Sequence, residues 1–247
     1  AGRAPVSAAL FFYRLGTRLA APFAGLAFRA RVKEGKEDPA RLSERDGRPG
    51  HPRPDGPLIW LHGASVGESL MLLGVFNALR ESRPDLSGLI TSQTLTSADL
   101  IARRAPKGLI HQMAPLDTPG RTARFIAHWQ PDLAVFAESE IWPNLIEASR
   151  RAGVPCALVN ARMTRTSLTG WARARGAIGH LLGEFGYIGA ADGATAKGLS
   201  DLIGRPVPAV GNLKLSQPAP DVDRKQYREW KQRIGKRPVI LAASTHA

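Results

Sequence analysis

Carboxylate side chains follow two apolar runs of the sequence, at the point where each run gives way to a turn. Glu68 stands shortly after the run 58–62, and Glu138 and Glu140 follow the run 132–137. Such a carboxylate can serve as a general base, and paired carboxylates can act as acid and base on a glycosidic bond. In an open α/β sheet the carboxyl ends of the strands face the ligand crevice, so we expect these three side chains to share one site.

The turn Gly63-Ala64-Ser65-Val66-Gly67 allows other interpretations. It matches the G-x-S-x-G nucleophile elbow, which would make Ser65 the nucleophile of a serine hydrolase. The histidines available as triad partners are His111, His128 and His180. A phosphate-binding loop is disfavoured, because neither G-x-x-x-x-G-K-S/T nor G-x-G-x-x-G is present. If Gly67 and its small neighbours give a substrate close access, Glu68 is the working residue; otherwise it only complements the dipole of the helix that it begins.

Four further side chains stand where other runs end. Asn160 ends the run 155–160 and Arg162 follows it. Arg162 could bind a carboxylate or phosphate bidentately or be a surface arginine. Trp142 could stack on a sugar or simply pack at a helix start. Lys214 ends Gly211-Asn212-Leu213-Lys214, where it could stabilise developing negative charge or be solvated.

Short apolar runs alternate with helical patterns along the chain and would position these residues. This alternation predicts an α/β fold, a parallel sheet with helices on both faces. The predicted strands are 58–62, 87–92, 109–113, 132–137, 155–160, 186–190 and 207–211. The predicted helices are 68–83, 96–104, 118–129, 143–152, 168–183 and 194–203.

The first 33 residues carry six Lys/Arg and no acidic residue among many apolar side chains. This pattern is typical of a basic amphipathic helix in a membrane interface. A signal peptide and a helix packed on the domain are the alternatives. Residues 34–57 are rich in proline, glycine and charge and predict a surface linker, whose first half could be ordered over the crevice.

We assign residues 58–215 to one α/β domain and residues 216–247 to a proline-containing linker and the start of a second. The second domain would begin near residue 221, with a helix near 223–234 and a strand at 238–242, and would be cut off after Ala247.

Composition sets the remaining bounds. The 247 residues carry a net charge of +13, which suggests an anionic partner: nucleic acid, an acidic membrane surface or a phosphorylated substrate. Cys156 is the single cysteine and lies in an apolar run, so disulfides and cysteine metal sites are excluded.

Taken together, six short motifs make this sequence resemble the N-terminal half of the bacterial 3-deoxy-D-manno-octulosonic acid (Kdo) transferases. The motifs are Gly35-Lys36-Glu37-Asp38-Pro39, Ser65-Val66-Gly67-Glu68, Glu138-Ser139-Glu140-Ile141-Trp142-Pro143-Asn144, Asn160-Ala161-Arg162, Gly211-Asn212-Leu213-Lys214 and Ala243-Ser244-Thr245-His246. The resemblance implies a Rossmann-like domain of a GT-B enzyme, with two such domains facing a cleft.

The resemblance also implies a reaction. Kdo would pass with inversion from CMP-Kdo to the lipid A precursor (lipid IVA) at the cytoplasmic face of the inner membrane, in lipopolysaccharide core synthesis. Glu68 would be the general base, and Glu138 and Lys214 would support the transition state. The substrate-binding residues would be Ser65, Gly67, Lys36, Glu140, Trp142, Asn160 and Arg162. Neither metal nor cofactor is implied, and the partners are the lipid acceptor and anionic membrane lipids rather than nucleic acid.

The sequence departs from the family pattern at two places. Asp46 stands where the family usually has an apolar or aromatic residue, and the CMP-binding motifs would lie beyond Ala247. We therefore expect this chain to be inactive alone. A serine hydrolase using Ser65 and a non-catalytic module that binds anionic lipid stay open as alternatives.

Overall fold

The computed structural model describes residues 7–216 and 222–240, and the chain divides into two compact units, residues 1–216 and 217–247. The first unit contains a six-stranded sheet in the order β3-β2-β1-β4-β5-β6, in which every pair of neighbouring strands is parallel. The strands are β1 (Leu58–His62), β2 (Ser87–Ser92), β3 (Leu109–Met113), β4 (Leu133–Ala137), β5 (Cys156–Ala161) and β6 (Tyr187–Ala190). This is the doubly wound Rossmann order, whose switch point lies between β1 and β4. The predicted fold class is confirmed.

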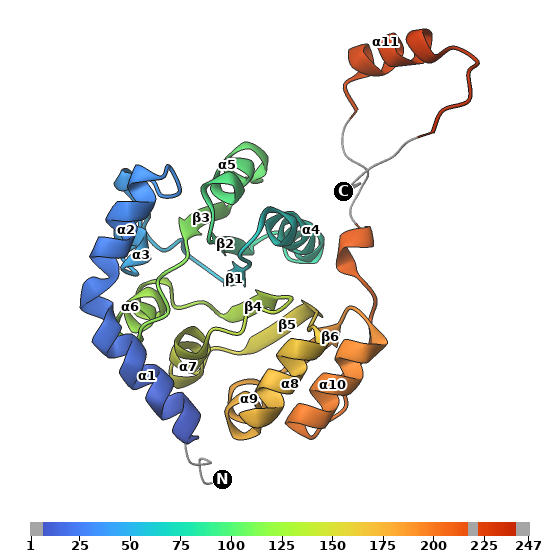
Figure 1. Cartoon of the computed structure of the whole chain (residues 1–247). Coiled ribbons are helices and arrows are strands. Elements are labelled where there is room, and N and C mark those ends of the chain that lie inside the picture. Colours follow the sequence, from blue (N-terminus) through green and yellow to red (C-terminus); the bar gives the residue numbers. More distant parts are fainter. Residues whose placement is uncertain (1–6, 217–221, 241–247) are drawn as a thin grey trace. The chain divides into compact units, whose positions relative to one another are not determined.

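Alternate residues of the central strands supply two separate cores. Leu58 and Trp60 of β1 lie in one apolar cluster, while Ile59 and Leu61 lie in the other. Because both faces are covered, the strand reads as a continuous apolar run rather than as an alternating one. The first cluster includes residues of α6, α7, α9 and α10, and the second includes residues of α4 and α5 (Figure 1).

The crossover helices begin and end close to where periodicity and capping residues place them. They are α4 (Val66–Ser82), α5 (Leu95–Arg104), α6 (Pro119–Trp129), α7 (Pro143–Arg151), α8 (Arg165–Arg173), α9 (Arg175–Leu182) and α10 (Gly193–Ile203). Ser65, Thr94 and Asp192 cap α4, α5 and α10 by accepting a backbone N–H of the first turn.

Two predicted elements differ. The segment predicted as one helix over 168–183 is broken at Ala174, whose φ of −117° and ψ of 39° leave the helical region. The predicted strand 207–211 is wrong: Ala209 makes a single isolated bridge to Ala190. Pro206 and Pro208 flank Val207 and have no N–H to donate to a ladder, which explains why the run does not extend the sheet.

The basic N-terminal segment is helical and packs on the domain. It consists of α1 (Ala8–Ala20), the 3₁₀ turn η1 (Ala21–Phe23) and α2 (Ala24–Lys33). Leu10 and Ala24 face inward, whereas the larger apolar side chains face outward. The outward group comprises Phe11, Phe12, Leu15, Leu19, Phe23 and Leu26. None of the helices within 7–216 and 222–240 combines the length and the apolar content needed to cross a bilayer.

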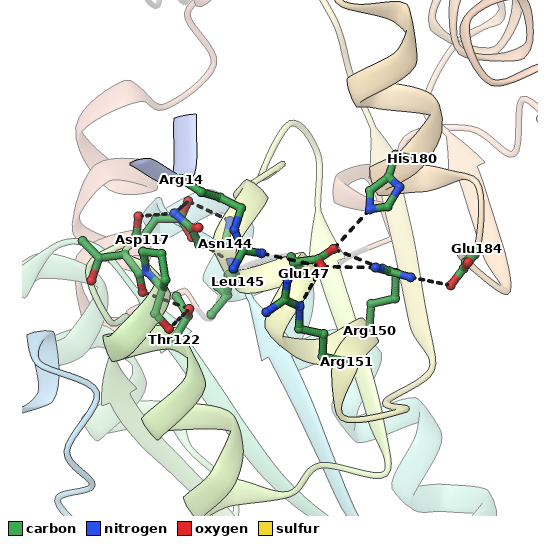
Figure 2. Close-up of polar contacts among 12 residues, drawn as sticks. Arg14, Asp117, Thr122, Asn144, Leu145, Glu147, Arg150, Arg151, His180 and Glu184 are labelled. Carbon is green, nitrogen blue, oxygen red and sulfur yellow. Dashed lines mark hydrogen bonds and ion pairs between the residues drawn. The ribbon is translucent and has the colours of Figure 1, made fainter. Parts of the chain in front are cut away.

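Polar contacts attach α1 to the helices beneath it. Tyr13 donates its hydroxyl to Asp117 Oδ2 at 2.8 Å, and Asp117 also accepts the backbone N–H groups of Asn144 and Leu145 at the start of α7. Arg14 lies 3.6 Å from the carboxylate of Glu147, which Figure 2 shows among several cationic side chains. Helix α1 is therefore positioned by the buried carboxylates of Asp117 and Glu147 as well as by apolar packing.

Residues 34–57 are more ordered than a linker. They contain η2 (Pro39–Arg41) and α3 (Leu42–Arg45), and the Arg45 side chain is only 3% exposed. Its guanidinium binds Glu37, the side chain and carbonyl of Gln93, and the carbonyl of Ala114, so the segment is fastened to the strand ends. Asp46, the residue at which the sequence departs from the resembled pattern, accepts a hydrogen bond from Arg121 at 2.6 Å and so forms an ion pair.

The second unit contains α11 (Arg224–Ile234), whose residues are solvent-exposed except for the half-buried Ile234. This agrees with the predicted helix. Val239 and Ile240, which belong to the predicted strand 238–242, are exposed and not in a strand, while residues 241 and 242 lie outside the described residues.

Candidate active site

The turn after β1 holds Glu68 in one position through neutral donors. Its Oε2 accepts the N–H of Ala64 at 2.7 Å, and its Oε1 accepts the hydroxyl of Ser65, also at 2.7 Å. Ser65 Oγ in turn accepts the N–H of Glu68 at 3.3 Å, which completes a reciprocal capping arrangement. The Glu68 side chain makes no ion pair within the part of the chain that the structure describes, although the residue is only 8% exposed. A carboxylate oriented by neutral groups keeps lone pairs available for a proton.

A second carboxylate is paired with the lysine predicted at the end of the domain. Lys214 Nζ lies 2.7 Å from Glu138 Oε1, and the side chain of Asn160 donates to the same oxygen at 3.1 Å. Asn160 also accepts the N–H of Leu213 at 2.9 Å, so it joins the end of β4 to the segment that carries the lysine. Glu138 and Asn160 have φ of 50° and 53°, a left-handed conformation that is rare outside glycine and concentrates at functional sites.

The two turns approach each other closely around Gly67. A β-carbon at Gly67 would lie 3.3 Å from Lys214 Nζ, so a larger side chain would displace the lysine. A β-carbon at Gly63 would lie 2.9 Å from the β-carbon of Glu68, closer than such contacts allow. Because Gly63 and Gly67 have no side chain, Glu68 packs against one end of this turn and Lys214 against the other, at the carboxyl ends of β1 and β4.

Glu140 and Trp142 form the other side of this group. The indole N–H of Trp142 donates to Glu140 Oε2 at 2.6 Å. Burial raises the pKa of Glu140 above its ordinary value; the bond from Trp142 opposes this, while the negative charges of Glu68 and Glu138 raise the pKa further. The three predicted carboxylates therefore lie near enough to influence one another.

His62, the last residue of β1, lies buried behind Glu140. Its Nδ1 is 2.8 Å from the hydroxyl of Thr91, which also accepts the indole N–H of Trp60 at 2.9 Å. Trp60 can only donate, so the threonine hydroxyl is free to donate to Nδ1, and the ring proton then sits on Nε2. Nε2 is 3.8 Å from Glu140 Oε2. Burial lowers the pKa of His62 to about 3, so the ring is neutral and its N–H faces a carboxylate.

Two of the predicted substrate-binding residues are not in contact with this group. Lys36 pairs with Glu34 at 2.8 Å, and both side chains are largely exposed. Arg162 is exposed and lies near Asp192, which follows β6. The backbone N–H of Thr195 is the main cause that lowers the pKa of Asp192, and the positive charge of Arg162 adds to it. Their roles in substrate binding stay predictions.

Among the residues that the structure describes, the geometry does not provide a serine hydrolase triad. Ser65 has an extended backbone, with φ of −106° and ψ of 166°, and its hydroxyl is hydrogen-bonded to Glu68. The histidines proposed as partners bond elsewhere: His111 with Arg41 and Ser92, His128 with the carbonyl of His51, and His180 with Glu147. Among the described residues, no group of three or more His, Cys, Asp or Glu side chains is placed to hold a metal ion.

Comparison with known sequences then assigns the family. The profile of the family described as 3-Deoxy-D-manno-octulosonic-acid transferase (kdotransferase) matches residues 40–217. The chain belongs to this family. The matched range includes every predicted site residue except Lys36, and it covers both turns and the segment of Lys214.

Individual Kdo transferases show the same relationship. A probable mitochondrial 3-deoxy-D-manno-octulosonic acid transferase of Arabidopsis thaliana is 39% identical over 165 residues, covering 66% of this chain and 37% of the relative. The enzyme of Rickettsia bellii is 32% identical, covering 87% of this chain and 51% of the relative. That of Bordetella pertussis is 32% identical, covering 94% and 56%. The chain thus spans about half the length of the curated relatives it matches.

Solved structures show the fold alone. UDP-GlcNAc 2-epimerase from Neisseria meningitidis, bound to UDP-GlcNAc, superposes with a TM-score of 0.50 at 14% identity, covering 72% of this chain and 54% of that chain. The Rossmann-like sheet expected of a Kdo transferase is therefore present.

Sequence reasoning missed His62 and Asp117 as residues of this region. Both carry a recognisable signal: His62 is the polar last residue of an otherwise apolar strand, and Asp117 follows β3 just before a helix. Their partners, Thr91 and Tyr13, come from other segments, and no periodicity connects them.

Proposed function

We propose that this chain forms the acceptor side of an inverting glycosyltransferase that moves Kdo from CMP-Kdo to the lipid A precursor (lipid IVA) in lipopolysaccharide core synthesis. The observation that carries the proposal is the carboxylate of Glu68, oriented by two neutral donors and placed beside the Lys214–Glu138 ion pair. Family membership supports the reaction class. We assign donor binding to the half of the relatives that this chain does not match.

In the proposed reaction Glu68 accepts the proton of an acceptor hydroxyl. The oxygen then forms a bond to the anomeric carbon of Kdo, the bond from that carbon to the phosphate of CMP breaks, and CMP leaves with its electrons. A base acts efficiently when it is within hydrogen-bond reach and fixed in direction, and the bonds from Ala64 and Ser65 supply that fixation.

Lys214 is proposed to stabilise the negative charge that develops as CMP leaves. In the unliganded protein its ammonium is neutralised by Glu138, and Asn160 holds Glu138 in place. A preorganised cation costs little reorganisation when charge appears nearby. Glu140 and Trp142 are proposed to contact the acceptor sugar, since a partly buried carboxylate next to an indole face offers hydrogen bonding and stacking together.

The N-terminal helices are proposed to hold the enzyme on the cytoplasmic face of the inner membrane. Phe12, Leu19, Phe23 and Leu26 are each at least 65% exposed on α1, η1 and α2. Arg18, Arg29, Arg31 and Lys33 lie on the same segment and are exposed. Apolar side chains flanked by cations suit the interface of an anionic leaflet.

The test is transfer of labelled Kdo from CMP-Kdo to the tetra-acylated acceptor, by a protein in which this chain is joined to a CMP-Kdo-binding domain. Glu68→Gln is expected to lower kcat by about 10²–10⁴-fold, the usual value of a general base. Ser65→Ala, which removes only one of the two bonds that orient Glu68, is expected to cost much less. Full activity of Glu68→Gln would remove the proposed base.

The anionic-lipid-binding module is a second candidate that the exposed apolar face of α1 and α2 favours. The same assay separates the two. If Glu68→Gln leaves transfer intact while loss of the apolar face abolishes vesicle binding, the chain acts as a membrane module. A fluorophosphonate probe should not label Ser65 in either case, because that hydroxyl is engaged with Glu68.

A further inference from the structure

An apolar cavity lies between the N-terminal helices and the strand ends. Its volume is about 680 Å³, within the range of ligand pockets. The helices contribute Ala20, Phe23, Ala24, Ala27 and Phe28, and Trp142 lines the cavity from the side of the carboxylate group. The inner helix face carries alanines, so space remains between it and the domain.

The buried ion pair that lines the cavity is already satisfied. Arg45 and Glu37 pair at 3.0 Å, each only 3% exposed, and every guanidinium nitrogen of Arg45 donates to Glu37, Gln93 or Ala114. An arginine whose donors are all used does not require a polar ligand. The accessible surface of the cavity therefore favours an apolar occupant.

The cavity is open to the outer apolar face of the helices. Phe23 lines the cavity and is also 67% exposed, so it belongs to both surfaces. An acyl chain that leaves a bilayer beside Phe23 would thus exchange one apolar environment for another.

A basic pocket adjoins the cavity on the other side of Ala21 and Thr118, which line both. Its volume is about 650 Å³, and it is lined by four arginines and one acidic residue: Arg18, Arg48, Arg121, Arg124 and Asp46. Arg121 and Arg124 bind Asp46, whereas the side chains of Arg18 and Arg48 make no ion pair or hydrogen bond within the described residues. Guanidinium groups of this kind bind phosphate bidentately.

We propose that the apolar cavity receives one acyl chain of the lipid acceptor and that the basic pocket receives a phosphate of the same molecule. The charge complementarity of the two adjoining pockets selects this occupant: an uncharged lipid would leave the arginines unused, and a soluble phosphate ester would leave the apolar cavity empty. The proposal rests on the proposed function, since it assigns two further contacts to the acceptor of that reaction.

Filling the cavity tests the acyl contact. Ala20→Trp and Ala27→Trp place an indole at exposed rim positions, and Ala30→Trp makes the same change on α2 away from the cavity. Binding to the 247-residue chain is measured in neutral detergent for the tetra-acylated glucosamine disaccharide bisphosphate and for its fully deacylated form. The rim variants should bind the acylated probe at least about ten-fold more weakly, as expected when two methylene groups lose apolar contact. They should bind the deacylated probe normally, and Ala30→Trp should change neither.

The outcomes separate the inference from the function. If the unvaried chain binds both probes equally, or the rim variants match it, the acyl site is wrong and the proposed function stands. If the unvaried chain binds neither probe, the acceptor assignment itself fails. Arg48→Gln should weaken both bisphosphate probes but not an acylated, dephosphorylated one. If Arg48→Gln binds the bisphosphate probes as tightly as the unvaried chain does, the proposed phosphate contact is overturned.

Fluorescence locates the chain directly. A probe brominated along one acyl chain should quench Trp142, which lines the cavity, and Trp142→Phe should remove the quenched component. If the quenching is unchanged in Trp142→Phe, the acyl chain lies elsewhere and the inference is overturned.

Discussion

Two buried glutamates of the first unit are compensated in opposite ways. Figure 2 shows Glu147 of α7 facing Arg14, Arg150, Arg151 and His180. These side chains lie 3.6, 3.1, 2.8 and 3.2 Å from its carboxylate oxygens, in that order. Glu68 is held by a backbone N–H and a hydroxyl and makes no ion pair among the described residues. Both carboxylates are fixed in position, but only Glu147 is surrounded by positive charge.

The difference decides what each carboxylate can do. Burial alone would raise the pKa of Glu147, but the hydrogen bonds from Arg150, Arg151 and His180 outweigh it and hold the pKa at about 2. Such a group is a poor proton acceptor at neutral pH and serves to join α1, α7 and α9. Glu68 is instead oriented by a backbone N–H and a hydroxyl, with no cation bound to it among the described residues. In the candidate site the cation is Lys214, which pairs with Glu138 rather than with Glu68, the proposed base.

The prediction with the largest expected effect tests whether the position of Lys214 matters for kcat. Lys214→Ala removes the cation that pairs with Glu138, and we expect kcat of the two-domain protein to fall by about 10²–10³-fold, as when one charge-stabilising donor is lost. Acceptor binding and thermal stability should change little, because the lysine side chain is 34% exposed and makes one ion pair.

Lys197→Ala is the matched control. Lys197 makes a single pair with Asp201 on the surface of α10, and its loss should leave the rate unchanged. If Lys214→Ala lowers stability and rate together, the Lys214–Glu138 pair is structural like the cluster around Glu147, and the contrast between the two regions fails.

The second prediction concerns the stability supplied by Glu147. Glu147→Gln should lower the free energy of unfolding by about 3 kcal/mol at pH 7, the usual cost of breaking a buried ion pair. Because the folded pKa of Glu147 lies below its ordinary value of 4.5, its contribution is complete above that value and is lost as the pH falls toward about 2. Urea unfolding at pH 7 and at pH 3 should therefore show a smaller difference between the variant and the unvaried protein at pH 3.

Glu184 provides the control for this cluster. It lies 3.7 Å from Arg150 but is 69% exposed, so Glu184→Gln should change stability by no more than about 0.5 kcal/mol. An equal effect of the two substitutions would mean that burial does not distinguish them.

A smaller effect is expected where α1 meets the start of α7. Tyr13→Phe removes the hydroxyl that donates to Asp117, and it should cost about 1–2 kcal/mol in urea unfolding because Asp117 is buried. Tyr187→Phe is the comparison: its hydroxyl has no hydrogen-bond partner within the described part of the chain, and we expect no measurable change. A loss of stability confined to Tyr187→Phe would contradict the assigned contact.

The sequence predicts the fold well because local signals and global order agree. Each of the six strands is a short, mostly apolar run followed by a helix that begins with a capping side chain or a proline, and the carboxyl ends of such strands must share one edge. Strand order and direction alone therefore place Glu68, Glu138 and Asn160 together. The same reasoning errs locally: the run at 207–211 has strand-like residues, but its prolines leave too few donors for a ladder.

The sequence does not predict which cation each carboxylate meets. Lys214 reaches Glu138 because Asn160, in a left-handed conformation, bonds to both Glu138 and the N–H of Leu213. Left-handed backbone at a non-glycine residue gives no compositional signal. Arg14 likewise meets Glu147 only because α1 packs across α7, a contact between segments 133 residues apart that no local pattern records.

The smallest expected effect concerns Lys36, which the family motif places among the substrate-binding residues. In the structure Lys36 pairs with Glu34, and the side chains are 62% and 54% exposed, so solvent screens the pair and it should contribute little to stability. Lys36→Ala should therefore leave urea unfolding unchanged, and affinity for the acylated bisphosphate should fall by less than about three-fold if the lysine stays at the surface. Lys33→Ala, an exposed lysine on the same segment, gives the baseline for loss of one charge. A fall of ten-fold or more for Lys36→Ala alone would show that the lysine leaves Glu34 to bind the acceptor. The candidate site would then gain a second mobile cation and differ still more from the fixed charges around Glu147.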